Sequence, residues 1–194
     1  MTTVPGTLIL INGPTSSGKS SLISALQSAL PEPYLEAGLD KFLWMLPGRY
    51  FKQPLWPQIL GIQGQAGPAM RTLAHGMHHA LAALLRAGNN VLADHVLLEA
   101  DWLQECEMLF AGLPALFVGA LCPLAVLEER ERARGDRTLG HARAQLARAH
   151  HGARYDMIVD TSQVTPEEGA RAVLAHLAAY GANRAFNTGL YRVG

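Results

Sequence analysis

The pattern of hydrophobic and polar positions changes its period along the chain and predicts strands and helices in alternation. Residues Thr7 to Asn12 form a short apolar run, rich in β-branched residues and followed by a glycine, which is typical of a buried strand leading into a turn. From Lys19 to Leu30 the apolar residues fall on one face of a helix, and Pro31 and Pro33 end it. The chain therefore begins with a strand, a glycine-rich turn and a helix.

The rest of the chain repeats this alternation. Further strands are predicted at 34–39, 91–93, 115–121 and 157–159. The middle two are apolar runs without polar alternation, which suits strands that helices cover on both faces of a parallel sheet. Helical spacing predicts a helix over 70–84, and a capping box of Thr165 and Glu168 begins another that reaches about Tyr180. We expect a three-layer α/β fold with a five-stranded parallel sheet flanked by helices.

Residues 46–68 interrupt the alternation. This stretch carries four prolines and four glycines among aromatic and apolar residues, and neither period continues through it. We interpret it as a structured insertion, for which a hairpin is one option. Residues 183–194 show no periodicity and are predicted to be a tail after a single domain formed by residues 1–182.

Composition and charge narrow the class of protein. Hydrophobic residues make up 49% of the chain and charged residues 16%, which is typical of a folded globular domain. The 16 basic and 16 acidic residues balance, so we expect no nucleic acid as a partner. The two cysteines form no CxxC pair, which indicates reduced thiols in a cytoplasmic protein. The N-terminal apolar run is too short to span a bilayer, so we expect no membrane segment there. The oligomeric state is not indicated.

The strongest motif is a phosphate-binding loop between the first strand and the first helix. Its spacing is GxxxxGK(S/T), in which backbone N–H groups surround phosphate oxygens at the positive end of a helix. The residues expected to hold a nucleotide are Gly13, Pro14, Thr15, Ser16, Ser17, Gly18, Lys19, Ser20 and Ser21. Lys19 would bridge the outer phosphates during catalysis, and Ser20 would ligate magnesium. A glycine-rich turn with a chance lysine is the alternative, and the flanking strand and helix argue against it.

Beyond this loop, the chain resembles the chloramphenicol phosphotransferase family of P-loop kinases from about residue 7 to residue 180. The resemblance is carried by GPTSSGKSSL, LPEPYLEAGLDKFLWMLP, GPAMRTLAHGMHHALAALLRAGNNVLADHV, the ERERARGDR stretch and YDMIVDTS. Only the first of these is shared by P-loop proteins generally. The resemblance implies the P-loop NTPase fold, ATP and Mg²⁺ as cofactors, and transfer of a phosphoryl group to the hydroxyl of a small molecule.

The resemblance also assigns a general base. In that family, the aspartate that closes the second strand takes the proton from the acceptor hydroxyl, and the matching residue is Asp40 within GLDKF. A carboxylate beside the transferred phosphate can accept this proton and orient the oxygen for in-line attack. The alternative is an N-cap for the following helix, and both roles could coexist.

An arginine-rich segment at 127–150 is expected to form a lid over the nucleotide. A helix continued through Gly135 would place Arg130, Arg134 and Arg137 on one side. By resemblance, Arg130 would bind ATP, and Arg134 and Arg137 would neutralise charge that develops on the transferred group. A solvated helix is the alternative, and a break at Gly135 would leave Arg137 in the lid loop.

Asp94 ends the third predicted strand, in VLADHV. P-loop enzymes often place a carboxylate here that holds a magnesium-bound water, so Asp94 is a candidate for the metal site together with Ser20. The family tends to show two acidic residues at this point, whereas the second here is His95. A buried, hydrogen-bonded Asp94 without a metal role is the alternative.

Histidines offer a competing interpretation. His75, His78 and His79 have the i,i+3 and i,i+4 spacing that suggests zinc, but no HExxH glutamate accompanies them. We therefore predict solvated or pocket-lining histidines here, and the same for His150 and His151.

Six aromatic or large apolar residues follow the proposed base, and they would line an apolar acceptor pocket or form a small core beneath a loop: Phe42, Trp44, Met45, Tyr50, Phe51 and Trp56. The leading hypothesis is a kinase of chloramphenicol or a similar antibiotic. The alternatives are a kinase of a sugar, sugar nucleotide or nucleoside, and a non-catalytic ATP-binding regulatory module.

Overall fold

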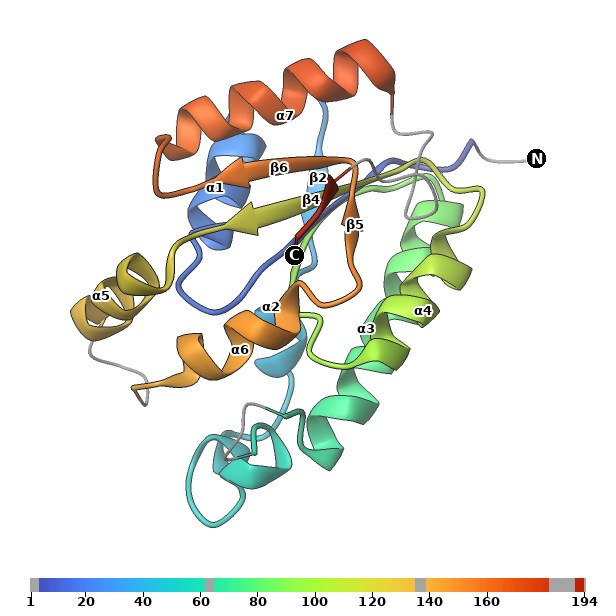
Figure 1. Cartoon of the computed structure of the whole chain (residues 1–194). Coiled ribbons are helices and arrows are strands. Elements are labelled where there is room, and N and C mark those ends of the chain that lie inside the picture. Colours follow the sequence, from blue (N-terminus) through green and yellow to red (C-terminus); the bar gives the residue numbers. More distant parts are fainter. Residues whose placement is uncertain (1–3, 62–64, 135–138, 182–190, 194) are drawn as a thin grey trace.

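A computed structural model describes residues 4–61, 65–134, 139–181 and 191–193, and it has three layers, with a parallel sheet between two groups of helices (Figure 1). The strands are β1 (Leu8–Asn12), β2 (Tyr34–Glu36), β3 (Asn90–His95), β4 (Ala115–Leu121), β5 (Arg154–Tyr155), β6 (Met157–Asp160) and β7 (Tyr191–Arg192). The helices are α1 (Lys19–Ala29), α2 (Leu39–Leu43), α3 (Pro68–Arg86), α4 (Ala100–Phe110), α5 (Leu124–Arg134), α6 (His141–Ala149) and α7 (Pro166–Tyr180), with 3₁₀ turns η1 (Gly48–Phe51) and η2 (Trp56–Gln58).

The main sheet has the order β2-β3-β1-β4-β6, and all its strands are parallel. The predicted five-stranded parallel sheet is confirmed. Strand β1 lies in the centre of the sheet between β3 and β4. Strands β2 and β3 lie on one side of it, and the later strands β4 and β6 lie on the other, so the strand order reverses its direction at β1. In open α/β sheets, ligands bind at such a switch point, beyond the carboxyl ends of the strands. The loop after β1 therefore begins where a ligand site is expected.

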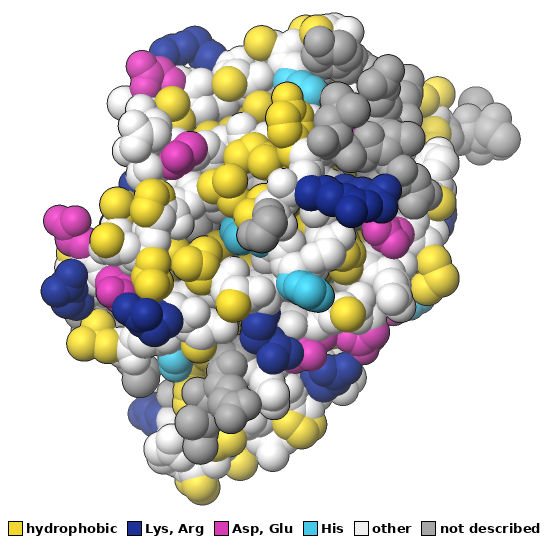
Figure 2. Space-filling view, in the orientation of Figure 1, with side chains coloured by type: hydrophobic (Ala, Val, Ile, Leu, Met, Phe, Trp, Pro, Cys, Tyr) yellow, Lys and Arg dark blue, Asp and Glu magenta, His cyan; other side chains and the backbone are white. Residues whose placement is uncertain are grey.

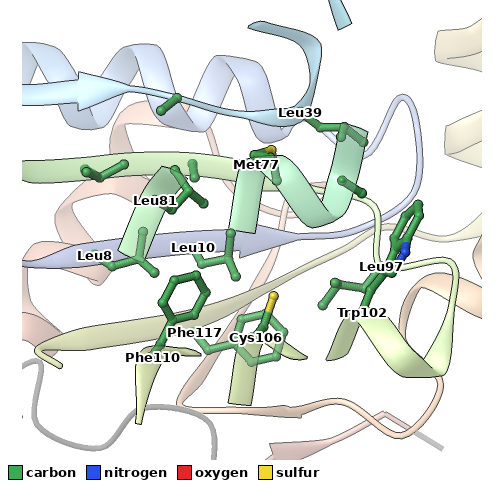
Figure 3. Packing of buried hydrophobic residues seen from close by; sticks show 14 of the residues in the cluster. Leu8, Leu10, Leu39, Met77, Leu81, Leu97, Trp102, Cys106, Phe110 and Phe117 are labelled. Atoms are coloured by element: carbon green, nitrogen blue, oxygen red, sulfur yellow. The ribbon is translucent and has the colours of Figure 1, made fainter. Parts of the chain in front are cut away.

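Each face of the sheet is covered by its own pair of helices. Side chains of β1 alternate, so that Leu8 and Leu10 pack under α3 and α4, whereas Ile9 and Ile11 pack under α1 and α7. Figure 3 shows the first of these cores, in which Phe117 of β4 meets residues of β1 and α4. Burial of both faces explains the uninterrupted apolar runs that predicted these strands.

The amino end of α7 has the capping box that its sequence predicts. The Thr165 hydroxyl oxygen accepts from the Glu168 N–H at 3.2 Å, and the Glu168 carboxylate accepts from the Thr165 N–H at 2.8 Å. These two contacts satisfy two backbone donors that a helix end leaves unpaired.

Replacing Thr165 by alanine should lower the free energy of unfolding by about 1 kcal/mol, because the side-chain acceptor is lost. Urea denaturation should show a lower midpoint with an unchanged slope. Thr72, an exposed residue inside α3, is the matched control, and its change to alanine should stay within about 0.5 kcal/mol. Equal losses in the two variants would contradict a capping role.

Several boundaries differ from the expectations. The second strand ends at Glu36 rather than at residue 39, and α2 begins at Leu39. Within the described part of 46–68 there is no hairpin of paired strands; this segment forms η1, η2 and a single bridge between Leu60 and Ala66. The last described residues are not all irregular either, since β7 pairs antiparallel with β5. None of the helices in the described ranges is long and apolar enough to cross a membrane.

Candidate active site

The loop between β1 and α1 wraps around its own lysine. The buried Lys19 ammonium group donates to the carbonyl oxygens of Gly13 at 2.9 Å and Pro14 at 2.8 Å. Ser16 and Gly18 have left-handed backbone conformations, with φ of 63° and 83°. For serine this conformation is uncommon and costs conformational energy, which is typical of a loop shaped for a ligand. The sequence motif is thus folded as a closed phosphate-binding loop, the P-loop.

The P-loop fits an anion. The hydroxyl oxygens of Ser16 and Ser17 are buried and have no hydrogen-bond partner among the described residues. Helix α1 follows directly and carries no acidic residue in its first turn, so its positive end faces the loop uncompensated by an acid. Buried polar atoms normally find a partner, and phosphate oxygens would supply it here.

Gln145 of α6 contacts the P-loop, although the sequence did not predict it as a site residue. Its side-chain oxygen accepts from the Thr15 N–H at 2.8 Å, across 130 positions of sequence. The contact brings the segment predicted as a lid onto the phosphate-binding loop. No motif marks this glutamine, and only the docking of α6 could have revealed it.

Two of the three predicted lid arginines lie beside the P-loop. Arg130 donates to the Thr161 hydroxyl at 3.2 Å and to its carbonyl at 2.7 Å, and that hydroxyl donates to the carbonyl of Ser17 at 2.8 Å. Arg134 is exposed at the end of α5. The third, Arg137, lies outside the described residues. Arg130 is therefore held in place by Thr161, whereas the exposed Arg134 lies at the solvent side of the site.

Two cavities meet at the P-loop, and Ser16, Gly18 and Arg134 line both. The smaller, about 380 Å³, extends toward α5 and α7 and is also lined by Ser21 and Arg130. The larger, about 470 Å³, extends toward α2 and the 46–68 segment. The loop thus separates two spaces, as a phosphate donor and an acceptor require.

Two carboxylates face the larger cavity together with Lys19 and Ser20. The pKa of Asp94 is raised above its ordinary value, mainly by burial and also by the nearby Asp40, and the Lys19 charge offsets only part of this shift. A Cβ on Gly38 would lie 1.7 Å from a carboxylate oxygen of Asp94, so a larger residue at this position would displace the Asp94 side chain. Gly38 occupies the N-cap position of α2, which means that Asp40 is not the N-cap but lies in the first turn.

One wall of the larger cavity is aromatic. Trp44, Phe51 and Trp56 line it, and the Trp44 and Phe51 rings lie 5.0 Å apart. The Trp56 ring stacks on His141 of α6, with centroids 6.2 Å apart and planes within 13°. Trp56 and His141 thus join the 3₁₀ turn η2 and helix α6 in the lining of this cavity.

The other three residues predicted for this pocket lie elsewhere. Phe42 and Tyr50 pack against the main core, and Met45 is exposed to solvent. The aromatic cluster thus divides between the two interpretations that the sequence left open, a pocket wall and an extension of the core.

The prediction of solvated or pocket-lining histidines is wrong for His78 and His150, which are both buried. His150 is hydrogen-bonded to the Tyr155 hydroxyl at 2.7 Å, and Asn12 donates to the same hydroxyl at 2.7 Å. Burial, with a smaller effect of the Lys19 charge, lowers the pKa of His150 to about 4. This ring is therefore neutral. Through the Tyr155 hydroxyl it is linked to Asn12, the last residue of β1.

The P-loop after the central strand, with a cavity on either side and carboxylates in one of them, defines a P-loop kinase, a phosphotransferase with a hydroxyl acceptor. The chain belongs to the chloramphenicol phosphotransferase-like protein family, whose model matches residues 6–178. It is 32% identical over 179 residues to "Putative O-phosphotransferase Rv2636" of Mycobacterium tuberculosis, covering 86% of this chain and 80% of the relative.

Solved structures with the same fold include kinases and a resistance protein. The APS kinase CysC of Mycobacterium tuberculosis, solved with AMPPNP and APS, is 18% identical and has a TM-score of 0.65 over 90% of this chain and 98% of its own. A tunicamycin resistance protein of Deinococcus radiodurans is 18% identical, with a TM-score of 0.64 over 89% and 95%. A gluconokinase of Sinorhizobium meliloti 1021 is 22% identical, with a TM-score of 0.61 over 93% and 96%. At these identities the likeness concerns the fold.

Proposed function

We propose that this protein transfers the terminal phosphoryl group of ATP, with Mg²⁺, to a hydroxyl of chloramphenicol or a similar antibiotic. The observation that carries the proposal is the larger cavity, in which Asp40, the P-loop and an aromatic wall face one space. Its volume of about 470 Å³ suits a drug-sized acceptor.

The residues present fit ATP and Mg²⁺. The buried hydroxyls of Ser16 and Ser17, the Lys19 ammonium and the end of α1 suit the phosphates, and Arg130 lines the adjoining cavity. Ser20 and Asp94 supply the hard oxygen ligands that Mg²⁺ prefers. When bound, ATP supplies the phosphoryl group and Mg²⁺ offsets phosphate charge.

Asp40 is the proposed general base. Its carboxylate accepts the proton of the acceptor hydroxyl and orients the oxygen toward the P-loop. Lys19 balances charge on the phosphates, and Arg134, with Arg137 beyond the described residues, stabilises charge that develops during transfer. Helix α6 contacts Thr15 on the phosphate side of the site and Trp56 on the acceptor side. Through these contacts the lid segment would respond to both ligands and exclude water from the site.

The aromatic wall favours an acceptor with a ring, which chloramphenicol has in its nitrophenyl group. Trp44, Phe51 and Trp56 offer large apolar faces for such a ring. Gln53 and Gln145 add polar groups to the same lining, which would suit a sugar, sugar nucleotide or nucleoside as the second candidate.

The testing experiment is ADP release by the purified protein with ATP and Mg²⁺, with and without chloramphenicol, and mass spectrometry of the product. A phosphorylated drug is the expected result. Changing Trp56 to alanine should raise the KM for the drug about tenfold, since stacked rings contribute roughly 1 kcal/mol or more. The exposed Met45 is the control, and its change to alanine should leave KM unchanged.

ADP release at background with chloramphenicol, but above it with sugars or nucleosides, would contradict the antibiotic as acceptor and retain the kinase. Tight ATP binding, with no stimulation of ADP release by chloramphenicol, sugars or nucleosides, would favour a regulatory module.

A further inference from the structure

A second cluster of ionisable groups lies on the other face of β3 from Asp94. His75 and His78 of α3 both direct Nδ1 at the same carboxylate oxygen of Glu105 on α4, at 2.7 Å and 2.5 Å. These three ligand atoms all lie within 4.8 Å of one another. The cluster takes no part in the proposed phosphoryl transfer.

We propose that His75, His78 and Glu105 form a binding site for Zn²⁺. Two imidazoles and one carboxylate are a donor set that zinc takes in proteins, with a fourth position left for water or another ligand. The third ligand, which the spacing of the histidines does not reveal, is supplied by Glu105 on the neighbouring helix α4.

The backbone already holds the ligands at the required spacing. Residues three apart lie on one helix face, so α3 presents both rings to α4. Tetrahedral zinc, with bonds of about 2.0–2.2 Å, needs ligand atoms about 3.4 Å apart. The present hydrogen-bond distances would have to open by roughly 0.7–0.9 Å, which small side-chain rotations supply without moving either helix.

The protonation states also suit a metal. Burial lowers the pKa of His78, so its ring is neutral near pH 7, which is the ligand form. Burial alone would raise the pKa of Glu105, but hydrogen bonds from His78 and His75 outweigh it and lower the pKa, so the carboxylate is ionised.

The buried His95 contacts the proposed ligand His78 on the side away from Glu105. Nε2 of His78 lies 2.7 Å from Nε2 of His95, and both rings are fully buried beside Trp102. When Nδ1 of His78 binds a metal, its Nε2–H donates to His95, and this contact fixes the tautomer and ring orientation as in many zinc sites.

The cluster opens to solvent on one side. His75 is partly exposed, and Nε2 of the exposed His79 lies 3.5 Å from the second oxygen of Glu105. Arg71, about one turn before His75 on α3, is paired with Asp101 at 2.7 Å and Glu99 at 3.3 Å, and these carboxylates offset its charge. A hydrated ion can therefore enter, and His79 can serve as the fourth ligand.

The test is calorimetric titration of the full chain, freed of metal with a chelator, with Zn²⁺. One equivalent should bind. Changing Glu105 to glutamine or His75 to alanine should weaken binding more than about tenfold, since even groups behind a ligand contribute that much. Both side chains are partly exposed, so these variants should fold, whereas the buried His78 is avoided. The exposed His151 is the control, and its change to alanine should alter nothing.

Two readouts separate this site from the phosphate site. Zinc should raise the melting temperature of the unmodified chain and of the His151→Ala variant, but not that of the Glu105→Gln variant. Binding should survive the change Asp94→Asn. The proposal is overturned if the unmodified chain shows no saturable binding of Zn²⁺, or if the Glu105→Gln and His75→Ala variants bind it as tightly as the unmodified chain. Loss of Zn²⁺ binding in the Asp94→Asn variant would also overturn it.

Discussion

Replacing Asp40 by asparagine should reduce turnover by about 10²–10⁴-fold, the range that a positioned general base contributes. Asparagine keeps the size of the side chain but cannot accept the hydroxyl proton. The affinity for ATP should be unchanged, because the phosphate-binding groups lie on the P-loop and α1. Single-turnover kinetics with the acceptor, combined with nucleotide titration, would measure the two effects separately.

The matched control is Asp101, an exposed carboxylate on α4 outside the cavity, whose change to asparagine should leave turnover unchanged. Retained turnover in the Asp40→Asn variant would dismiss Asp40 as the base. Joint loss of turnover and nucleotide binding would indicate that Asp40 organises the site rather than acting on the hydroxyl.

Replacing Gly38 by alanine is the second large effect that we expect. The new Cβ would lie 1.7 Å from a carboxylate oxygen of Asp94 and 3.0 Å from its backbone nitrogen, so the Asp94 side chain must move away. A displacement of about 1 Å in a catalytic constellation can lower the rate about 10²-fold. Steady-state kinetics should show this loss, and thermal unfolding should confirm that the variant is folded.

Two comparisons sharpen this test. At Gly76, in α3, nothing lies within 4 Å of an added Cβ, so its change to alanine should leave activity unchanged. In a double-mutant cycle, Gly38→Ala should add little once Asp94 is already alanine, because the clashing oxygen is gone. Full additivity would contradict the proposed contact between these two residues.

The parts of the fold that the sequence predicted are those with local causes. The P-loop motif is contained in eight consecutive residues, 13–20. The strand before it and the helix after it are each identified by the spacing of their own apolar residues. The cap of α7 is likewise contained in Thr165 to Glu168. Strands β1 and β4 are buried on both faces, so their apolar runs alone identified them.

The parts that sequence could not predict depend on contacts between distant residues. A single helix projection of α3 shows one apolar face, but α4 packs beside it and buries a second face that contains His78. Glu105 comes 27 positions after His78, and no spacing rule connects them. The strand predicted to reach residue 39 ends at Glu36, and Gly38 then lies against Asp94 of β3, a contact between residues 56 positions apart.

Strand β3 joins two environments through neighbouring residues. Asp94 lies opposite Ile11 and faces the P-loop, and His95 lies opposite Asn12 and faces the core under α3 and α4. Slippage of β3 by one residue would turn every side chain to the opposite face of the sheet, so that Asp94 would face the apolar interior and His95 would leave it. We therefore expect the turn at Gly88 and Asn89, which sets this pairing, to tolerate substitution far better than the insertion or deletion of a single residue.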